Sequence, residues 1–302
     1  IFNSIVFIII IIYYKIDIYL LRCDMNSDLI KKIKEISLLD ENIRSIIFTG
    51  SRLNNAVAKD GLEDFNLIVG LGELKLYMGL VNKLLIAEET IIKREERLSH
   101  HGYDLIHIRC LCEDESIIDL VLLDNANILD YIKDNSLVKN IVDKDLILPE
   151  DKVISDIKFR EEKISNKEFY DHVVNFYMKS VDVAISLARK EIIRANYLYD
   201  ILKKDLLAIV NLYIGQKYDF NVNTGRLGKN FKVYLDKPYY EMYLEIFNTN
   251  DLDDFWKSLF VASSLFRKLS LEISRSLDYS YPKKEDVKTM EYLRRLNDKY
   301  NI

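Results

Sequence analysis

Glycine, proline and cysteine are scarce in this chain: its 302 residues include nine glycines, three prolines and three cysteines. Few residues therefore interrupt helices, and 49% of the chain is apolar, so we expect a globular, helix-rich protein. The length suits two modest domains, each with its own core. Three unevenly spaced cysteines are too few for a disulfide framework or a zinc site.

Two of the cysteines fall in one expected strand. Cys110 and Cys112 share a face with Ile106 and Ile108, because alternate residues of a strand point the same way. We interpret both as reduced core residues, which predicts a cytoplasmic location.

An excess of basic residues is also lacking. The 43 Lys and Arg residues and 48 Asp and Glu residues give a formal net charge of −5. A nucleic-acid partner normally requires a clustered basic surface, so none is expected. The balance permits a cationic substrate, although a mildly acidic chain is also ordinary for a soluble cytoplasmic protein.

The first 24 residues lack the features of a signal peptide or a membrane span. Ile5 to Tyr14 is almost wholly apolar but too short to cross a bilayer, and neither a basic segment precedes it nor a small-residue cleavage site follows it. Signals of a folded domain start at Met25. We expect residues 1–24 to be a non-native or disordered leader whose removal leaves folding and ligand binding intact. The alternative is a membrane-associating segment.

Residues 25–150 alternate helix and strand signals, which predicts an α+β domain with a mixed sheet and flanking helices. The expected helices are Asp28–Leu38, a short one near Leu53–Val57, and Leu74–Leu85. The expected strands are Ile46–Thr49, Phe65–Val69, Tyr103–Cys112 and one around Asp119.

Residues 151–302 show helical spacing and almost no strand signal. Apolar residues recur at helical intervals in Val174 to Ala188, Leu202 to Tyr213 and Leu259 to Leu277. This pattern predicts long amphipathic helices in a helical bundle, the substrate-binding domain. Pro149 to Asp156 is the expected linker, and a small-molecule site is expected between the domains.

Two acids and an amide indicate a metal site for nucleotidyl transfer. Asp64 and Asn66 are two residues apart on one expected strand and so project from the same face. Asp119 interrupts an apolar strand, where a carboxylate is costly unless it meets a cation or sits at the strand's end. Carboxylates suit Mg²⁺, and paired metal ions stabilise the attacking and leaving oxygens. We expect all three residues to hold metal, with Asp64 and Asp119 as the catalytic pair.

A phosphate site is expected just upstream. Gly50 and Ser51 follow an apolar run and precede a helix-compatible stretch, which aims backbone N–H groups at a phosphate. We expect Ser51 and these N–H groups to hold the β- and γ-phosphates, with Arg52 reinforcing them.

Together these motifs resemble the aminoglycoside 6-adenylyltransferase (streptomycin adenylyltransferase) family of nucleotidyltransferases. The resemblance covers roughly Met25 to Tyr300, and the combination is far more specific than any single motif. It is carried by Gly50-Ser51-Arg52-Leu53-Asn54, Lys59-Asp60, Asp64-Phe65-Asn66, Ile118-Asp119-Leu120, Asp124 to Lys144, Ala188-Arg189-Lys190-Glu191-Ile192, Gly228-Lys229-Asn230-Phe231-Lys232, Leu265-Phe266-Arg267 and Tyr279-Ser280-Tyr281-Pro282.

The resemblance implies an enzyme that moves AMP from ATP, with Mg²⁺, onto a hydroxyl of a streptomycin-like aminoglycoside. It implies that Lys229 contacts the triphosphate, with Arg189 as a second basic residue. The expected partners are ATP and a cationic aminoglycoside, and we expect a monomer without a membrane partner.

Family members carry Asp at the position of Asn66. An amide oxygen can bind Mg²⁺ but has no formal charge, so we expect weaker metal retention. Three interpretations stay open: a slowed enzyme, an enzyme that uses another acid such as Glu63, and a relative that binds nucleotide without turnover.

The base that would activate the acceptor hydroxyl is not evident. Asp119 can serve only if it is not committed to metal, and Glu95 and Glu96 are alternatives, although a solvated charge run also explains them. Glu191 and Asp205 are either surface ion pairs on helices or acids that face a polycationic substrate.

The four histidines are expected at the surface. They include the neighbours His100 and His101, and none shows metal-ligand spacing with an acid.

Overall fold

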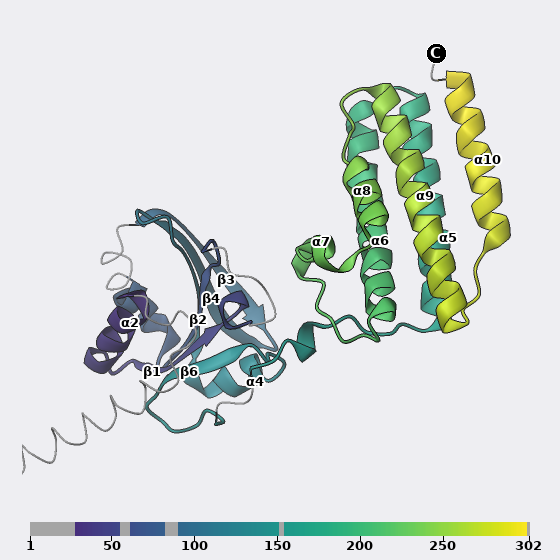
Figure 1. Ribbon diagram of the computed structural model, residues 1–302. Helices are drawn as coiled ribbons and strands as arrows, with labels where there is room; N and C mark the ends of the chain where they lie inside the picture. The colour runs from purple at the N-terminus through teal and green to yellow at the C-terminus, as the bar shows by residue number, and fades with distance from the viewer. Residues whose placement is uncertain (1–27, 55–60, 82–89, 151–153, 301–302) are drawn as a thin grey trace, which may run out of the picture. The chain divides into compact units, whose positions relative to one another are not determined.

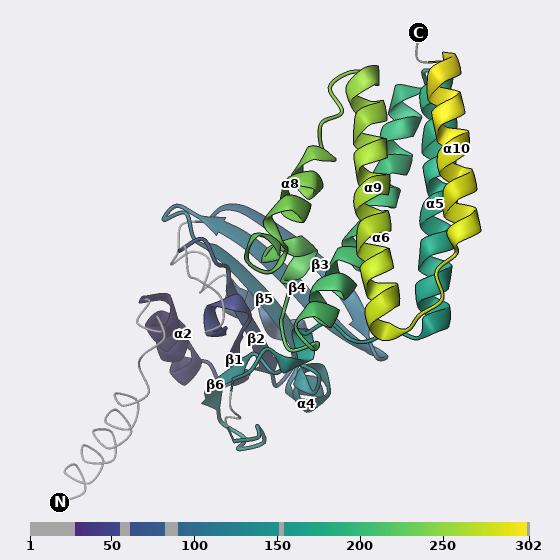
Figure 2. The same ribbon diagram turned by 45° about the vertical axis from the view of Figure 1, so that its right-hand side comes forward.

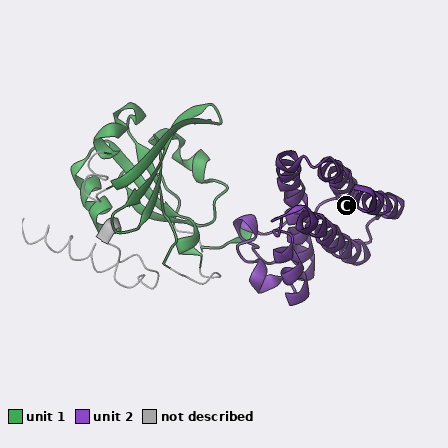
Figure 3. Ribbon diagram, turned by 90° about the horizontal axis from the view of Figure 1, so that it is seen from above, with its two compact units in different colours: residues 1–158 green, residues 159–302 purple. Residues whose placement is uncertain are grey.

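The computed structural model describes residues 28–54, 61–81, 90–150 and 154–300 (Figure 1). It divides the chain into two compact units, Ile1–Lys158 and Phe159–Ile302 (Figure 3). The division lies somewhat later in the chain than the boundary expected after residue 150. The expected leader, residues 1–24, lies outside the described residues, as does the Lys59-Asp60 part of the motif.

The described part of unit 1 is built on a six-stranded mixed sheet with the order β3-β4-β5-β2-β1-β6. Strands β2 and β5 are parallel, and the other neighbours are antiparallel. The strands are β1 (Ile43–Thr49), β2 (Phe65–Leu71), β3 (Thr90–His100), β4 (Tyr103–Cys112), β5 (Ile117–Asp124) and β6 (Val138–Asp143). The α+β fold class with a mixed sheet is therefore confirmed.

The inner strands of this sheet bury apolar side chains on both faces. One face packs against helix α2 (Asp28–Leu39), whose Ile30 and Ile33 join its core, and the other packs against the short helix α4 (Ile128–Ile132) (Figure 2). Burial on both faces explains why the inner strands are nearly continuous apolar runs. A charged side chain in such a strand is therefore exceptional.

Strands β3 and β6 are not foreseen in the sequence. β3 is an edge strand whose side chains are mostly exposed, and it contains Glu95 and Glu96, for which the sequence also allowed a solvated charge run. Charged residues are how natural edge strands avoid pairing with other chains, and they remove the apolar alternation that identifies a strand. β6 forms the opposite edge, and its side chains are only partly buried.

Two expected helices differ in the structure. The helix near Leu53–Val57 is replaced, in its described part, by the 3-10 turn η1 (Ser51–Leu53). The helix expected from Leu74 starts with the 3-10 turn η2 (Leu74–Leu76), and residues 77–81 are α-helical. In both places helix-compatible residues follow a strand directly, and the connection tightens the first turn. The remaining short turns are η3 (Asn125–Asn127) and η4 (Ile157–Phe159).

Unit 2 is helical, as expected. The three apolar repeats fall within α5 (Asn166–Ala188), α6 (Ile192–Lys217) and α9 (Leu252–Leu277). The unit also contains η5 (Arg226–Gly228), α7 (Phe231–Tyr234), α8 (Lys237–Glu245) and α10 (Lys283–Tyr300). Helices α5, α6, α9 and α10 run side by side around one apolar core (Figure 2).

Helix α5 starts earlier than its apolar repeat suggests. Ser165 and Glu168 form a reciprocal capping box, in which each side chain accepts a hydrogen bond from the other residue's backbone N–H. Such a cap supplies partners for two backbone donors that the helix leaves unpaired. Among the described residues, no helix combines the length and the apolar character needed to cross a membrane.

Candidate nucleotidyl-transfer site

Asp64, Asn66 and Asp119 meet at one end of the parallel strands β2 and β5. Asn66 is the register partner of Asp119, and Asp64 stands immediately before β2. Register partners on neighbouring strands point to the same face of the sheet, so the amide and the carboxylate lie side by side. The side chains of Asp64 and Asp119 are 26% and 16% exposed, which leaves them accessible yet partly shielded.

Arg109 joins the two acids. It lies opposite Asp119 on β4, with Nη2 2.8 Å from Oδ2 of Asp64 and Nη1 2.7 Å from Oδ2 of Asp119. Burial lowers the pKa of this guanidinium, but the hydrogen bonds to Asp119 and Asp64 outweigh that effect and leave the pKa above its ordinary value. One cation therefore holds both carboxylates.

His107 holds the other oxygen of Asp119. It stands two residues before Arg109 on β4, on the same face, and its Nε2 lies 2.7 Å from Oδ1 of Asp119. Its Nδ1 lies 3.9 Å from a carboxylate oxygen of Glu96. Each oxygen of Asp119 thus has a partner on β4, which fixes the orientation of this carboxylate.

Gly50 closes the site from the end of β1. Its φ of +90° and ψ of −162° lie in a region that essentially only glycine occupies. A Cβ at this position would lie 2.8 Å from the amide nitrogen of Asn66. The N–H of Gly50 donates to the carbonyl of Leu137 at 3.2 Å, so this N–H is engaged within the fold.

Ser51 and Arg52 form the turn after Gly50. Ser51 starts η1, and its carbonyl accepts a hydrogen bond from the N–H of Asn54 at 3.0 Å. Arg52 donates through Nε to the carbonyl of Glu63 at 2.9 Å, and its guanidinium carbon lies 3.8 Å from the ring centre of Phe65. Arg52 thus ties η1 to the start of β2 and helps to place Asp64.

Arg189 and Lys229 belong to unit 2. Arg189 caps the C-terminal end of α5 and is exposed. Lys229 follows η5 and is exposed, next to Gly228 with a φ of +79°. Both basic side chains are accessible to solvent, and their assignment to the triphosphate rests on the family resemblance.

Glu95, considered for proton transfer, and Glu191 and Asp205, considered for contact with a polycationic substrate, all have partners. Glu95 accepts a 2.5 Å hydrogen bond from the hydroxyl of Tyr77. Glu191 pairs with Arg194 at 3.0 Å, and Asp205 pairs with Lys179 of α5 at 2.6 Å. These pairs agree with the interpretation of Glu191 and Asp205 as ion pairs on helices.

The sequence shows no metal-ligand spacing between a histidine and an acid, but the fold brings two histidines and an acid together. His100, His101 and Asp130 offer ligand atoms within 4.8 Å of one another, because the β3–β4 turn stacks the two rings beside α4. Asp130 already bonds His101 at 2.9 Å and Lys133 at 2.6 Å. The cluster is therefore satisfied by its own hydrogen bonds.

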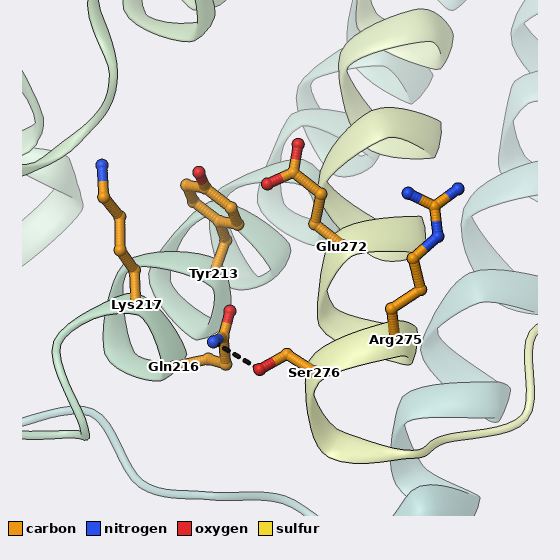
Figure 4. A pocket seen from close by; sticks show the side chains of 6 residues that line it. All are labelled: Tyr213, Gln216, Lys217, Glu272, Arg275 and Ser276. Atoms are coloured by element: carbon orange, nitrogen blue, oxygen red, sulfur yellow. Dashed lines mark hydrogen bonds between the residues drawn. The ribbon is translucent and has the colours of Figure 1, made fainter.

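A pocket of about 460 Å³ opens between α6 and α9 in unit 2 (Figure 4). It is lined by Tyr213, Gln216, Lys217, Glu272, Arg275 and Ser276. The side chains of Gln216 and Ser276 are joined by a 2.6 Å hydrogen bond, and Glu272 accepts a hydrogen bond from Tyr239. The pocket has two cations, Lys217 and Arg275, and its one acid, Glu272, already accepts a hydrogen bond. This charge balance does not suit a polycationic ligand.

Sequence reasoning missed Arg109 and His107. A signal for both exists: in Tyr103–Cys112 the apolar residues occupy alternate positions, which places His107 and Arg109 on the opposite face. Asp119 lies on the same face of its strand as Val121 and Leu123, which belong to a core cluster, so it interrupts an apolar strand as expected.

Comparisons with known proteins show the family to which the chain belongs. The family model described as streptomycin adenylyltransferase matches residues 24–296. An aminoglycoside 6-adenylyltransferase of Campylobacter jejuni is 28% identical over 270 residues, which cover 87% of this chain and 92% of the relative. That of Bacillus subtilis is 28% identical over 254 residues, which cover 82% and 89%. A crystal structure of an aminoglycoside 6-adenyltransferase from Bacillus subtilis covers 89% of this chain and 98% of its own, with 23% identity and a TM-score of 0.45.

Proposed function

Because the chain belongs to the streptomycin adenylyltransferase family, we propose that it transfers AMP from ATP to a hydroxyl of a streptomycin-like aminoglycoside. The observation that carries this proposal is the convergence of Asp64 and Asp119 on Arg109, beside Asn66 and Gly50. The relatives from Campylobacter jejuni and Bacillus subtilis are aminoglycoside 6-adenylyltransferases, which supports an aminoglycoside as the acceptor. An enzyme that consumes ATP in this way works in the cytoplasm.

The donor set fits a hard divalent cation such as Mg²⁺. Two carboxylates and an amide converge, and the two carboxylates already share a cationic partner in Arg109. Asp64, Asp119 and the amide oxygen of Asn66 would hold the ion, which when bound neutralises the charge of the reacting phosphates.

In the transfer, the acceptor oxygen bonds to the α-phosphorus of ATP as the bond to pyrophosphate breaks, and the hydroxyl proton must be taken up. Asp119 is poorly suited to take up this proton, because His107 and Arg109 engage both of its oxygens. We therefore assign Asp119 to charge stabilisation and His107 to positioning Asp119. Gly50, which has no side chain, allows the amide of Asn66 to pack closely against the end of β1.

A second candidate function is nucleotide binding without turnover. Two observations favour it: Asn66 supplies no charge, and Arg109 neutralises part of the charge of the two acids. Such a protein would bind ATP with an intact fold yet form no product.

The proposed function is tested by incubating the full chain with ATP labelled in the α-phosphate, Mg²⁺ and a panel of aminoglycosides. We expect label on streptomycin-like acceptors and release of unlabelled pyrophosphate, with Asp64→Ala inert. Binding of ATP without transfer to any acceptor supports the second candidate, and absence of ATP binding contradicts both.

A further inference from the structure

Arg109 occupies the position between two acids where a nucleotidyl-transfer site needs positive charge. Building on the proposed function, we propose that Arg109 takes the place of one of the two metal ions. The chain would then hold a single divalent cation in its working complex, the one that ATP brings with it.

The geometry of Arg109 supports this role. A planar guanidinium usually offers two parallel hydrogen bonds to one carboxylate. Here it divides them, with one nitrogen 2.8 Å from Asp64 and another 2.7 Å from Asp119. A bridge between two acids is the contact that a shared metal ion makes.

Its place in the sheet makes this bridge a built-in feature. Arg109 and Asp119 are register partners on β4 and β5, and Asp119 and Asn66 are register partners on β5 and β2. These three residues form one row across three strands. Backbone pairing, and not a flexible side chain alone, therefore holds the guanidinium beside the acids.

The charges agree with one metal ion. Two carboxylates carry two negative charges and Arg109 carries one positive charge, while Asn66 adds none. One divalent ion leaves the site with one net positive charge to meet the triphosphate. Two divalent ions would leave three, and each would face the guanidinium at short range, where repulsion amounts to several kcal/mol. The amide at Asn66 and the cation at Arg109 therefore both reduce the negative charge that could hold a second metal ion.

The test is the number of Mn²⁺ ions bound by the protein in complex with an ATP analogue that carries a methylene group between its α- and β-phosphorus atoms. Mn²⁺ replaces Mg²⁺ and is counted by electron paramagnetic resonance. We expect one Mn²⁺ for each wild-type chain. Two ions in the wild-type complex would overturn the proposal while leaving the proposed function intact. Absence of analogue binding would contradict both.

Arg109→Met removes the charge and should add a second Mn²⁺ site in the same complex, which Asn66→Asp should strengthen further in the double variant. Without nucleotide, Arg109→Met should bind Mn²⁺ about tenfold or more tightly than the wild type, because a cation no longer competes for Asp64 and Asp119. Unchanged stoichiometry in the double variant contradicts the proposal. Arg109→Lys keeps the charge and should still bind one ion.

Arg94→Met is the matched control. Arg94 is the register partner of Arg109 on β3 and lies on the same face, but it pairs with Glu96 and not with the acids of the site. Arg94→Met removes the same charge as Arg109→Met, but one strand farther from Asp119. We expect wild-type stoichiometry and wild-type Mn²⁺ affinity. An effect as large as that of Arg109→Met would show that Arg109 acts only through net charge.

A second readout needs neither nucleotide nor activity. In metal-free buffer Arg109→Met should lower the melting temperature, because Asp64 and Asp119 then repel each other without a cation. Mn²⁺ should restore the lost stability. A melting temperature that Mn²⁺ leaves unchanged would contradict competition between Arg109 and metal for these acids.

Discussion

Asn66 and Asp119 are direct register partners on the parallel strands β2 and β5, so an amide stands beside the carboxylate on which the site depends. The same two residues connect to the rest of the site, since Asn66 packs against Gly50 and Asp119 is held by Arg109 and His107. Changes at these positions should therefore separate metal binding, phosphate access and folding from one another.

Asn66→Asp should raise Mg²⁺ affinity and adenylyl transfer. A carboxylate at this position adds an anionic oxygen beside Asp64, and we expect a gain in transfer of about tenfold or more, equivalent to roughly 1.4 kcal/mol of transition-state stabilisation. Steady-state transfer assays on both forms measure it, with Asp64→Ala as the inactive control. Rapid turnover by the wild type together with no gain in Asn66→Asp would show that the amide is no defect.

Gly50→Ala should weaken both folding and nucleotide binding. A side chain at a φ of +90° is strained by about 1–2 kcal/mol, and its Cβ would lie 2.8 Å from the amide of Asn66. The matched control is Gly61→Ala, with a φ of +81° but no atom within 4 Å of the new Cβ. Urea unfolding and titration with the ATP analogue should show a larger loss in Gly50→Ala, and equal losses in the two variants would contradict the close packing of Gly50 on Asn66.

The bundle contains a buried ion pair whose disruption should destabilise unit 2. The side chain of Asp286 is 4% exposed and shares the N–H of Nε of Arg267 between its two oxygens, at 2.8 and 3.0 Å. It also accepts hydrogen bonds from Nη2 of Arg267 and, at 2.8 Å, from the hydroxyl of Tyr281. Asp286→Ala leaves the guanidinium without its partner and should cost about 3–5 kcal/mol of unfolding free energy.

Denaturant unfolding measures this cost. Asp298→Ala is the control, because Asp298 is an exposed acid on the same helix, α10. Its effect should stay within about 0.5 kcal/mol. Similar losses in the two variants would mean that Asp286 contributes no more than a surface charge.

Asp236 should make the stability of unit 2 depend on pH. Hydrogen bonds from Lys217 and Tyr213 hold the pKa of its carboxyl below the ordinary value near 3.8. A lowered folded-state pKa contributes stability that is present above the unfolded-state pKa and is lost as pH falls through the folded-state pKa. Asp236→Asn should therefore lower the melting temperature at pH 7, and this difference should shrink below about pH 4. A difference that is constant between pH 3 and pH 7 would exclude the charge of Asp236 as its cause.

The inner strands could be predicted from the sequence because burial on both faces makes them apolar runs. The edge strands β3 and β6 could not, because exposed charged residues carry no periodic apolar signal. The long helices α5, α6 and α9 could be predicted because the core of the bundle imposes one apolar stripe on each of them.

Asp119 could be singled out because it is a polar residue where an apolar one is normal, and Asp64 because it stands two residues before Asn66 at the start of an apolar strand. Arg109 and His107 could not, because polar residues on alternate positions of β4 are also typical of a half-exposed strand. Their pairing with Asp119 depends on the register between β4 and β5, which local sequence does not determine.

Mass spectrometry of streptomycin after incubation with ATP, Mg²⁺ and the wild-type chain tests the central claim most directly. The proposed function predicts a product that carries one added AMP, formed together with one pyrophosphate, and no product with Asp64→Ala. Asp64→Ala should still fold, as its melting curve would show. Unmodified streptomycin with the wild type, across a panel of aminoglycosides and with ATP demonstrably bound, would contradict the claim that this chain is an adenylyltransferase.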